Sequence, residues 1–239
     1  MLSNQAPGYA NVIDPGMYSV DEAEQVALQL MADGQRIPER FALALQGEPP
    51  PDNGRAERML ELLPRIAPPE RLLPLLDRIM PSSNTRIRSK AWKLYAAASA
   101  DLGWALTQID DGDARVAANV VEALWRAVPN EQLRELFLRA ALQERNRVAG
   151  NGLVGLFSCN DPRGMEIARR LAKHEDAGFR STVAWAIGHA CWREGLELLE
   201  DLRRDKADKV RKIADRSLVR ISRRHHGAAC SLRPAEVSV

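Results

Sequence analysis

The chain has 239 residues, of which 45% are hydrophobic and 28% charged, and its formal net charge is +2. This length suffices for one extended repeat domain or two small globular ones. Every apolar run is shorter than the ~18 residues of a transmembrane helix, and the N-terminus lacks the basic stretch and apolar core of a secretory signal. The three cysteines match no metal-ligand spacing, which fits a reducing environment. We therefore expect a cytoplasmic protein that does not enter a membrane.

The small net charge conceals an uneven distribution. Residues 139–226 hold 19 Lys and Arg against 12 Asp and Glu, whereas residues 1–138 hold 14 against 19. A basic C-terminal half suits an acidic partner or a phosphate backbone. The simpler interpretation is that long arginine side chains solvate the outer faces of helices.

The N-terminal part predicts irregular helical hairpins. Residues 1–18 contain Pro and Gly without helical periodicity and predict a flexible arm. Ser19 followed by Glu22 has the form of a capping box, which predicts a helix from about residue 20 to residue 32. Three more helices are expected at about 38–45, 55–66 and 69–80, with a proline-rich connection at residues 48–52.

From residue 87 onward the sequence repeats. Five segments align without gaps, and they start at Ile87, Val116, Val148, Phe179 and Val210, which are 29, 32, 31 and 31 residues apart. In each segment the first residue and those four and eight positions later are apolar or small, so they share one helical face. Asp, Asn, Pro or Gly then break the helix, and a second amphipathic helix follows. A period of about thirty residues predicts hairpins that bury their apolar faces by stacking on one another.

These units resemble HEAT repeats of the compact kind found in bacterial proteins. The likeness is carried by RVAANVVEALW (from Arg115), RVAGNGLVGLF (from Arg147) and FRSTVAWAIG (from Phe179). The resemblance implies an all-α, armadillo-like fold, a right-handed α-α superhelix or solenoid of about six to seven stacked hairpins that binds other macromolecules. The family's arginine one place after the first apolar residue is present in three repeats, as Arg88, Arg180 and Arg211.

The sequence thus divides into four parts. We expect a flexible N-terminal arm at 1–18, degenerate helical hairpins at 19–83, HEAT-like repeats at 84–222 and a disordered C-terminal tail at 223–239.

Motifs that would carry chemistry are scarce. The chain has no P-loop, no glycine-rich dinucleotide turn, no GxSxG elbow and no zinc-type pairing of Cys and His. HEAT-repeat hydroxylases need several His-Glu pairs, and His174-Glu175 is a single one. Cys159 and Cys191 fall at similar places in successive repeats; we expect buried core residues, with a redox pair as the alternative. We expect no metal and no cofactor.

Trp185 is the first candidate for contact with a partner. It lies six positions into its repeat, where most of the other repeats have a charged residue such as Lys93 or Glu122, so the sequence places it on the outside. Two interpretations stay open. The ring is an interface anchor, or it lies half-buried over a neighbouring repeat.

Polar residues supply the remaining candidates. Five arginines lie on the second helices and their edges: Arg139, Arg169, Arg170, Arg203 and Arg204. They alternate with acidic residues, which suits a protein partner better than a uniform nucleic-acid track. Asn119 and Asn151 occupy equivalent places in adjacent repeats and form a candidate polar ladder at a binding edge, with bonds to nearby backbone as the alternative.

Two functions follow from these features. The first is a non-catalytic scaffold or adaptor that binds a protein through its concave and edge surfaces. The second is an enzyme resembling the HEAT-like alkylpurine DNA glycosylases, or another DNA-binding protein that uses the basic C-terminal half. Its candidate carboxylates are Asp110, Asp111 or Asp113, near Trp104 and Trp125, although both tryptophans are expected in the core. HEAT-like phycobilin lyases are a weaker analogy that no specific residue supports.

Overall fold

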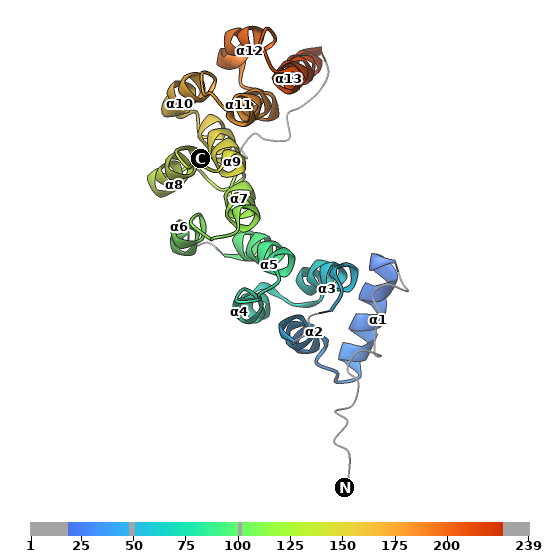
Figure 1. Cartoon of the computed structure of the whole chain (residues 1–239). Coiled ribbons are helices and arrows are strands. Elements are labelled where there is room, and N and C mark those ends of the chain that lie inside the picture. The colour runs from blue at the N-terminus through green and yellow to red at the C-terminus, as the bar shows by residue number, and fades with distance from the viewer. Residues whose placement is uncertain (1–18, 48–50, 100–101, 227–239) are drawn as a thin grey trace, which may run out of the picture. The chain divides into compact units, whose positions relative to one another are not determined.

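The structure is a computed structural model that describes residues 19–47, 51–99 and 102–226. All regular secondary structure in these ranges is helical (Figure 1). The chain divides into two compact units, Met1–Ala100 and Asp101–Val239. The predicted arm at 1–18, residues 48–50 of the proline-rich connection, Cys230 and the tail from residue 227 onward lie outside the described residues.

The first unit is built of five helices: α1 (Val20–Ala32), α2 (Ile37–Gln46), α3 (Asn53–Ile66), α4 (Pro69–Ile79) and α5 (Thr85–Ala98). Helix α3 contacts both α1 and α5, and α4 contacts α2. The helices therefore stack in two rows, and the core between the rows is made mostly of leucines such as Leu60, Leu63 and Leu76. The predicted capping box at α1 is confirmed, because Ser19 and Glu22 satisfy each other's backbone N–H groups.

The second unit continues the same arrangement with α6 (Gly103–Gln108), α7 (Ala114–Ala123), α8 (Glu131–Ala141), α9 (Asn146–Ser158), α10 (Arg163–Leu171), α11 (Ala177–Ala190), η2 (Arg193–Gly195), α12 (Leu196–Leu202) and α13 (Asp208–His226). Helices α7, α9, α11 and α13 lie side by side in that order, while α8, α10 and α12 form the second row (Figure 1). The first residues of the repeats in this unit are all buried, as the stacking prediction requires: Val116, Val148, Phe179 and Val210.

The repeat equivalence extends to hydrogen bonds. The Arg88 guanidinium donates to the carbonyl oxygen of Ser82, six residues earlier. Arg180 donates to the carbonyl oxygens of His174 and Glu175, and Arg211 does the same in the turn before α13. In these three repeats the arginine that follows the first apolar residue thus ties the first helix to the turn before it.

Small residues set the distance between α8 and α9. A Cβ atom placed on Gly152 would lie 2.4 Å from the backbone nitrogen of Ala141, and one on Gly155 would lie 2.3 Å from the Phe137 ring. Only glycine leaves room for this approach. Gly152 and Gly155 therefore let α8 approach α9 closely.

Three expectations need correction. Helix α13 continues to His226, so residues 223–226 are helical and do not belong to the predicted tail. Arginine is a good helix former, and nothing in this segment interrupts the backbone hydrogen bonds. Trp104 and Trp125 are half-buried and not in the core, because both lie near helix ends, where less of the neighbouring repeat covers them.

No helix among the described residues is long and apolar enough to span a bilayer.

Candidate partner-binding surfaces

A groove runs between α10 and the η2–α12 segment in the second row of helices. It is lined by Met165, Arg169 and Lys173 on one side and by Glu194, Glu197, Leu198 and Asp201 on the other. Met165 and Arg169 are four positions apart on α10 and therefore share one helical face; Lys173 lies in the turn that follows α10. The groove has a volume of about 230 Å³, which is less than the ~300 Å³ of the smallest typical small-molecule sites.

The two walls of this groove carry opposite charges. Arg169 on α10 and Lys173 in the turn after it are exposed and form no ion pair with any described residue. The facing wall presents the three exposed carboxylates, and the half-buried Met165 and Leu198 contribute apolar surface. A groove of this kind accepts a segment that carries both an acidic and a basic group. The three carboxylates would repel a phosphate backbone.

Three of the other four arginine candidates are engaged within the protein. Arg139 forms an ion pair with Asp110, which lies 29 residues earlier, and donates to the carbonyl oxygen of Leu106 at 3.3 Å. Arg203 pairs with Glu200 at 3.0 Å and with Asp215 at 2.7 Å. Arg204 lies 3.8 Å from Asp201. Such exposed pairs are weak and remain open to exchange with a partner. Arg170 is exposed and has no ion pair among the described residues. The structure therefore brings only Arg169 of the five arginines into the groove.

Trp185 is half-buried and belongs to an aromatic cluster on the other side of α11. Its ring lies 6.2 Å from that of Trp125 and 5.0 Å from that of His189. Ile187, two residues further along α11, packs on Gly195 beside α12. Two residues correspond to a turn of about 200° around a helix, so Trp185 points away from the groove.

The cluster covers α9. A Cβ atom on Gly150 would lie 3.4 Å from the Trp185 ring, and the indole N–H of Trp125 donates to the carbonyl oxygen of Asn151 at 2.9 Å. Trp125 and Trp185 come from the repeats before and after α9, and together they cover its face of small residues. Of the two interpretations of Trp185, the structure shows the half-buried one, with part of the ring accessible.

The predicted asparagine ladder needs correction. Asn151 is only 3% exposed, and its amide donates to the carbonyl oxygen of Ala118 at 2.6 Å. A buried amide that ties α9 to α7 satisfies the backbone of a neighbouring repeat and is not available to a partner. Asn119 is half-buried and accepts a hydrogen bond from Arg147 at 3.0 Å. The alternative, a bond to nearby backbone, thus holds for Asn151, whereas Asn119 binds an arginine side chain.

The residues considered for chemistry have structural roles. Asp113 caps α7 by accepting from two backbone N–H groups, Asp111 accepts from the backbone of Asp113, and Asp110 binds Arg139 and Gln143. The His174 ring packs on Phe179 at 4.4 Å. Within the three described ranges, no three His, Cys, Asp or Glu side chains are grouped as a metal would require.

Cys159 and Cys191 are both free thiols. Burial raises the pKa of Cys159, and the nearby Asp161 raises it further against the opposing effect of Arg134. Because the thiolate is the reactive form, this environment disfavours redox reactivity at Cys159. Cys191 ends α11 in the left-handed backbone region, with φ of 52°.

The two rows of stacked hairpins decide the architecture. The fold is a HEAT- or armadillo-like helical repeat. No protein-family model and no curated protein matches the sequence. An engineered protein from a structural genomics consortium shares 16% identity over 86% of this chain and 92% of its own, with a TM-score of 0.44. A designed armadillo repeat protein shares 14% identity over 87% of this chain and all of its own, with a TM-score of 0.41.

Proposed function

We propose that this protein is a non-catalytic cytoplasmic scaffold or adaptor that binds a protein partner through its second row of helices. The groove between α10 and α12 is the observation that supports the proposal. Its opposed charges suit a polypeptide, because a protein segment can present a carboxylate and a basic group within a few residues of each other. The free thiols of the protein, Cys159 and Cys191, fit the reducing environment of the cytoplasm.

The groove offers this partner both orientation and selectivity. Its volume of about 230 Å³ admits one or two side chains between Met165 and Leu198. The charged walls then fix the direction of the inserted segment, because the reversed orientation would place like charges together. An interface of usual size extends beyond one groove, and the exposed ion pairs of Arg203 and Arg204 lie on the same row of helices.

The glycosylase alternative finds less support. Its candidate carboxylates are engaged in capping and in ion pairs, as described for Asp110, Asp111 and Asp113. A catalytic carboxylate has to reach the substrate, and these three serve the turn between α6 and α7. Binding of nucleic acid without catalysis does not require these three carboxylates and would depend on basic residues elsewhere in the chain.

The test is affinity capture from a lysate of the source organism with three versions of the full chain, followed by mass spectrometry. Arg169→Glu with Lys173→Glu makes both walls of the groove acidic. Arg115→Glu with Arg126→Glu makes the same charge change at exposed positions away from the groove. We expect the partner to be captured by the wild type and by the second variant, and to be depleted at least tenfold with the first. Equal capture by all three versions would refute the role of the groove.

A further inference from the structure

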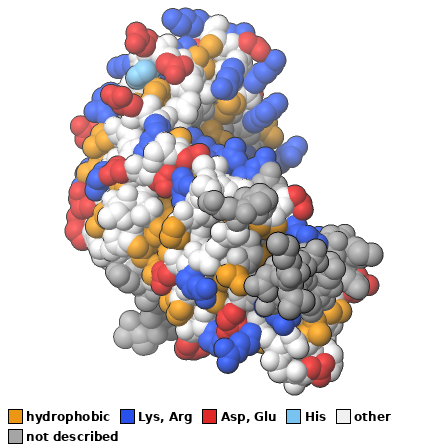
Figure 2. Space-filling view, turned by 60° about the horizontal axis from the view of Figure 1, so that its bottom comes forward, with side chains coloured by type: hydrophobic (Ala, Val, Ile, Leu, Met, Phe, Trp, Pro, Cys, Tyr) orange, Lys and Arg blue, Asp and Glu red, His pale blue; other side chains and the backbone are white. Residues whose placement is uncertain are grey.

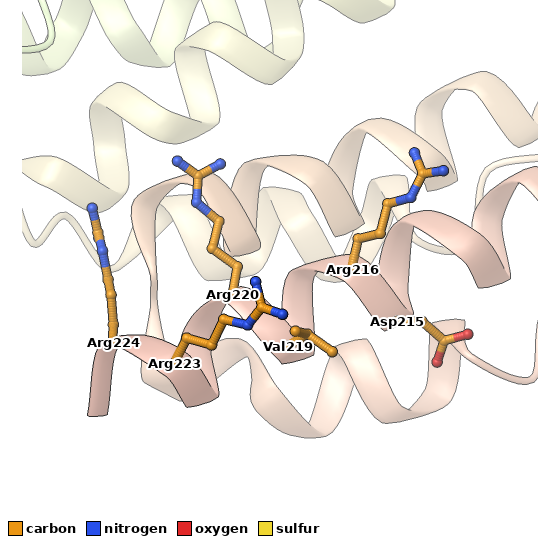
Figure 3. A pocket seen from close by; sticks show the side chains of 6 residues that line it. All are labelled: Asp215, Arg216, Val219, Arg220, Arg223 and Arg224. Atoms are coloured by element: carbon orange, nitrogen blue, oxygen red, sulfur yellow. The ribbon is translucent and has the colours of Figure 1, made fainter. Parts of the chain in front are cut away.

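Helix α13 carries a stripe of positive charge that the groove does not use. Lys209, Arg216, Arg220 and Arg223 are exposed, and Arg224 is half-buried. With 100° between successive residues, all five fall within about 100° of one another around the helix. Arg216, Arg220 and Arg224 extend to the same side, away from Asp215 (Figure 3). The stripe runs for about 21 Å along the helix axis from Lys209 to Arg223.

No carboxylate of α13 neutralises the stripe. Asp208 is bound by Lys212 at 2.6 Å and lies 3.3 Å from Arg211. Asp215 is held by Arg203 at 2.7 Å. None of the five stripe residues forms an ion pair with any part of the chain that the structure describes. The space-filling view shows Lys and Arg side chains gathered over the last repeats (Figure 2). The stripe is therefore uniformly positive, whereas the second row of helices carries both positive and negative side chains.

Partly accessible aromatic rings lie beside the stripe. The pKa of His189 is lowered, first by burial and then by the positive charges of Arg220 and Arg224, with Glu122 acting in the opposite direction. Helix α13 packs against α11, which carries His189 and Trp185, and the Ser217 hydroxyl of α13 donates to the carbonyl oxygen of Ala184 in α11 at 2.8 Å. The stripe therefore lies on the helix next to the cluster of His189, Trp185 and Trp125. On this side of the unit a row of cations lies on the helix next to these half-buried rings, which we call the aromatic ledge.

We propose that this face of α13 binds single-stranded nucleic acid, with the stripe along the phosphate backbone and the aromatic ledge next to the bases. Proteins that bind single strands combine a basic track with rings on which bases stack. An acidic peptide would use the cations but would leave the rings without a role. A membrane surface would call for apolar side chains alongside the cations, and Val219, 49% exposed, is the one large hydrophobic residue exposed on α13 among its described side chains.

The salt dependence of binding gives the proposal a magnitude. For single strands, each neutralised phosphate contributes about −0.7 to the slope of log K against log salt. Contact with four or five cations therefore predicts a slope of about −3. Replacing three of them should reduce the slope by about 2 and weaken binding roughly 100-fold at 0.1 M salt.

The experiment is fluorescence anisotropy of labelled oligothymidylate and oligouridylate of about 20 nucleotides with the full chain, in about 50 to 200 mM NaCl. The variant Arg216→Gln with Arg220→Gln and Arg223→Gln should bind about 100-fold more weakly. Replacing the same three arginines by lysine keeps the charge and should keep the slope.

A charge-matched control separates the stripe from net charge. Arg115, Arg126 and Lys206 are exposed on other elements, and changing all three to Gln should leave affinity within a few-fold of the wild type. Quenching of tryptophan fluorescence on binding should report the ring contact. Equal weakening by both triple variants would overturn the proposal. The proposal would also be overturned if polyglutamate competed as strongly as the unlabelled oligonucleotide, or if the protein bound only to phosphatidylserine vesicles. The stripe and the groove share no residue, so either surface can fail alone.

Discussion

Gly152→Ala tests the close contact on which the stack depends. The added Cβ atom would lie 2.4 Å from the Ala141 backbone nitrogen and 2.7 Å from the Phe137 carbonyl oxygen. Ordinary contact needs about 3.5 Å, so α8 and α9 would have to separate by about 1 Å. Both clashing atoms belong to the backbone of α8, and therefore no rotamer change can relieve the contact.

The expected effect is the difference between two opposing contributions. In an exposed helix, Gly→Ala would stabilise by about 1 kcal/mol. Overpacking a tight contact costs about 1–3 kcal/mol, and a clash with rigid backbone belongs at the upper end. We expect a net loss of about 2 kcal/mol, which lowers the Tm by about 4–8 °C for a chain of this size. Thermal unfolding followed by circular dichroism measures the change.

Gly112→Ala is the matched control. A Cβ atom at Gly112 would meet nothing within 4 Å, and the residue lies in an exposed turn before α7. Its stability should stay within about 0.5 kcal/mol of the wild type. If Gly152→Ala melted at or above the wild-type temperature while Gly112→Ala behaved as expected, the inferred packing of α8 on α9 would be wrong.

Three further predictions concern charge and the aromatic cluster. Asp205→Ala should lower the Tm more than Asp201→Ala, because Arg180 holds Asp205 at 2.7 and 2.9 Å in a buried pair, whereas Asp201 belongs to an exposed one. Since the pKa of His189 is lowered on folding, the unfolded chain takes up the proton first, and stability should fall as the pH drops below about 6.5. His189→Phe should flatten this decline in urea midpoints measured between neutral and mildly acidic pH. Trp185→Ala should leave helicity intact in circular dichroism but weaken the binding of oligothymidylate, and unchanged binding would limit the ring to packing.

Much of the helical framework could be predicted from the sequence. The capping box at Ser19 and Glu22 gave the start of α1, and Gly34, with φ of +82°, follows its end. The gapless alignment predicted which positions are buried, since each repeat uses the same face against its neighbours. Asp113 and Asn130 cap the helices that they precede. All of these features depend on residues close in sequence or on one helical period.

The surface was harder to predict, because it depends on contacts between repeats. The sequence indicated the direction in which Trp185 points, but not that Trp125 would reach α9 from the other side. In the sequence Asn151 resembled a surface residue, because the residues that bury it belong to neighbouring repeats. The pairing of Arg139 with Asp110 did leave a signal, because the two opposite charges lie 29 residues, about one repeat, apart. Comparing charges at that spacing would have shown that this arginine is occupied.

Neighbouring repeats can supply counter-charges, but no described carboxylate forms an ion pair with the stripe of α13. Within the stack the next repeat supplies a counter-charge, as Asp205 does for Arg180. An exposed helical face needs polar side chains to remain soluble, but alternating signs would serve that need as well as a single sign. Near α13, Arg203 occupies the carboxylate of Asp215, so that the outer stripe of Arg216, Arg220 and Arg223 remains uniformly positive. Solubility accounts for the polarity of this face, whereas its single sign and the adjoining aromatic rings are better accounted for by a polyanionic ligand.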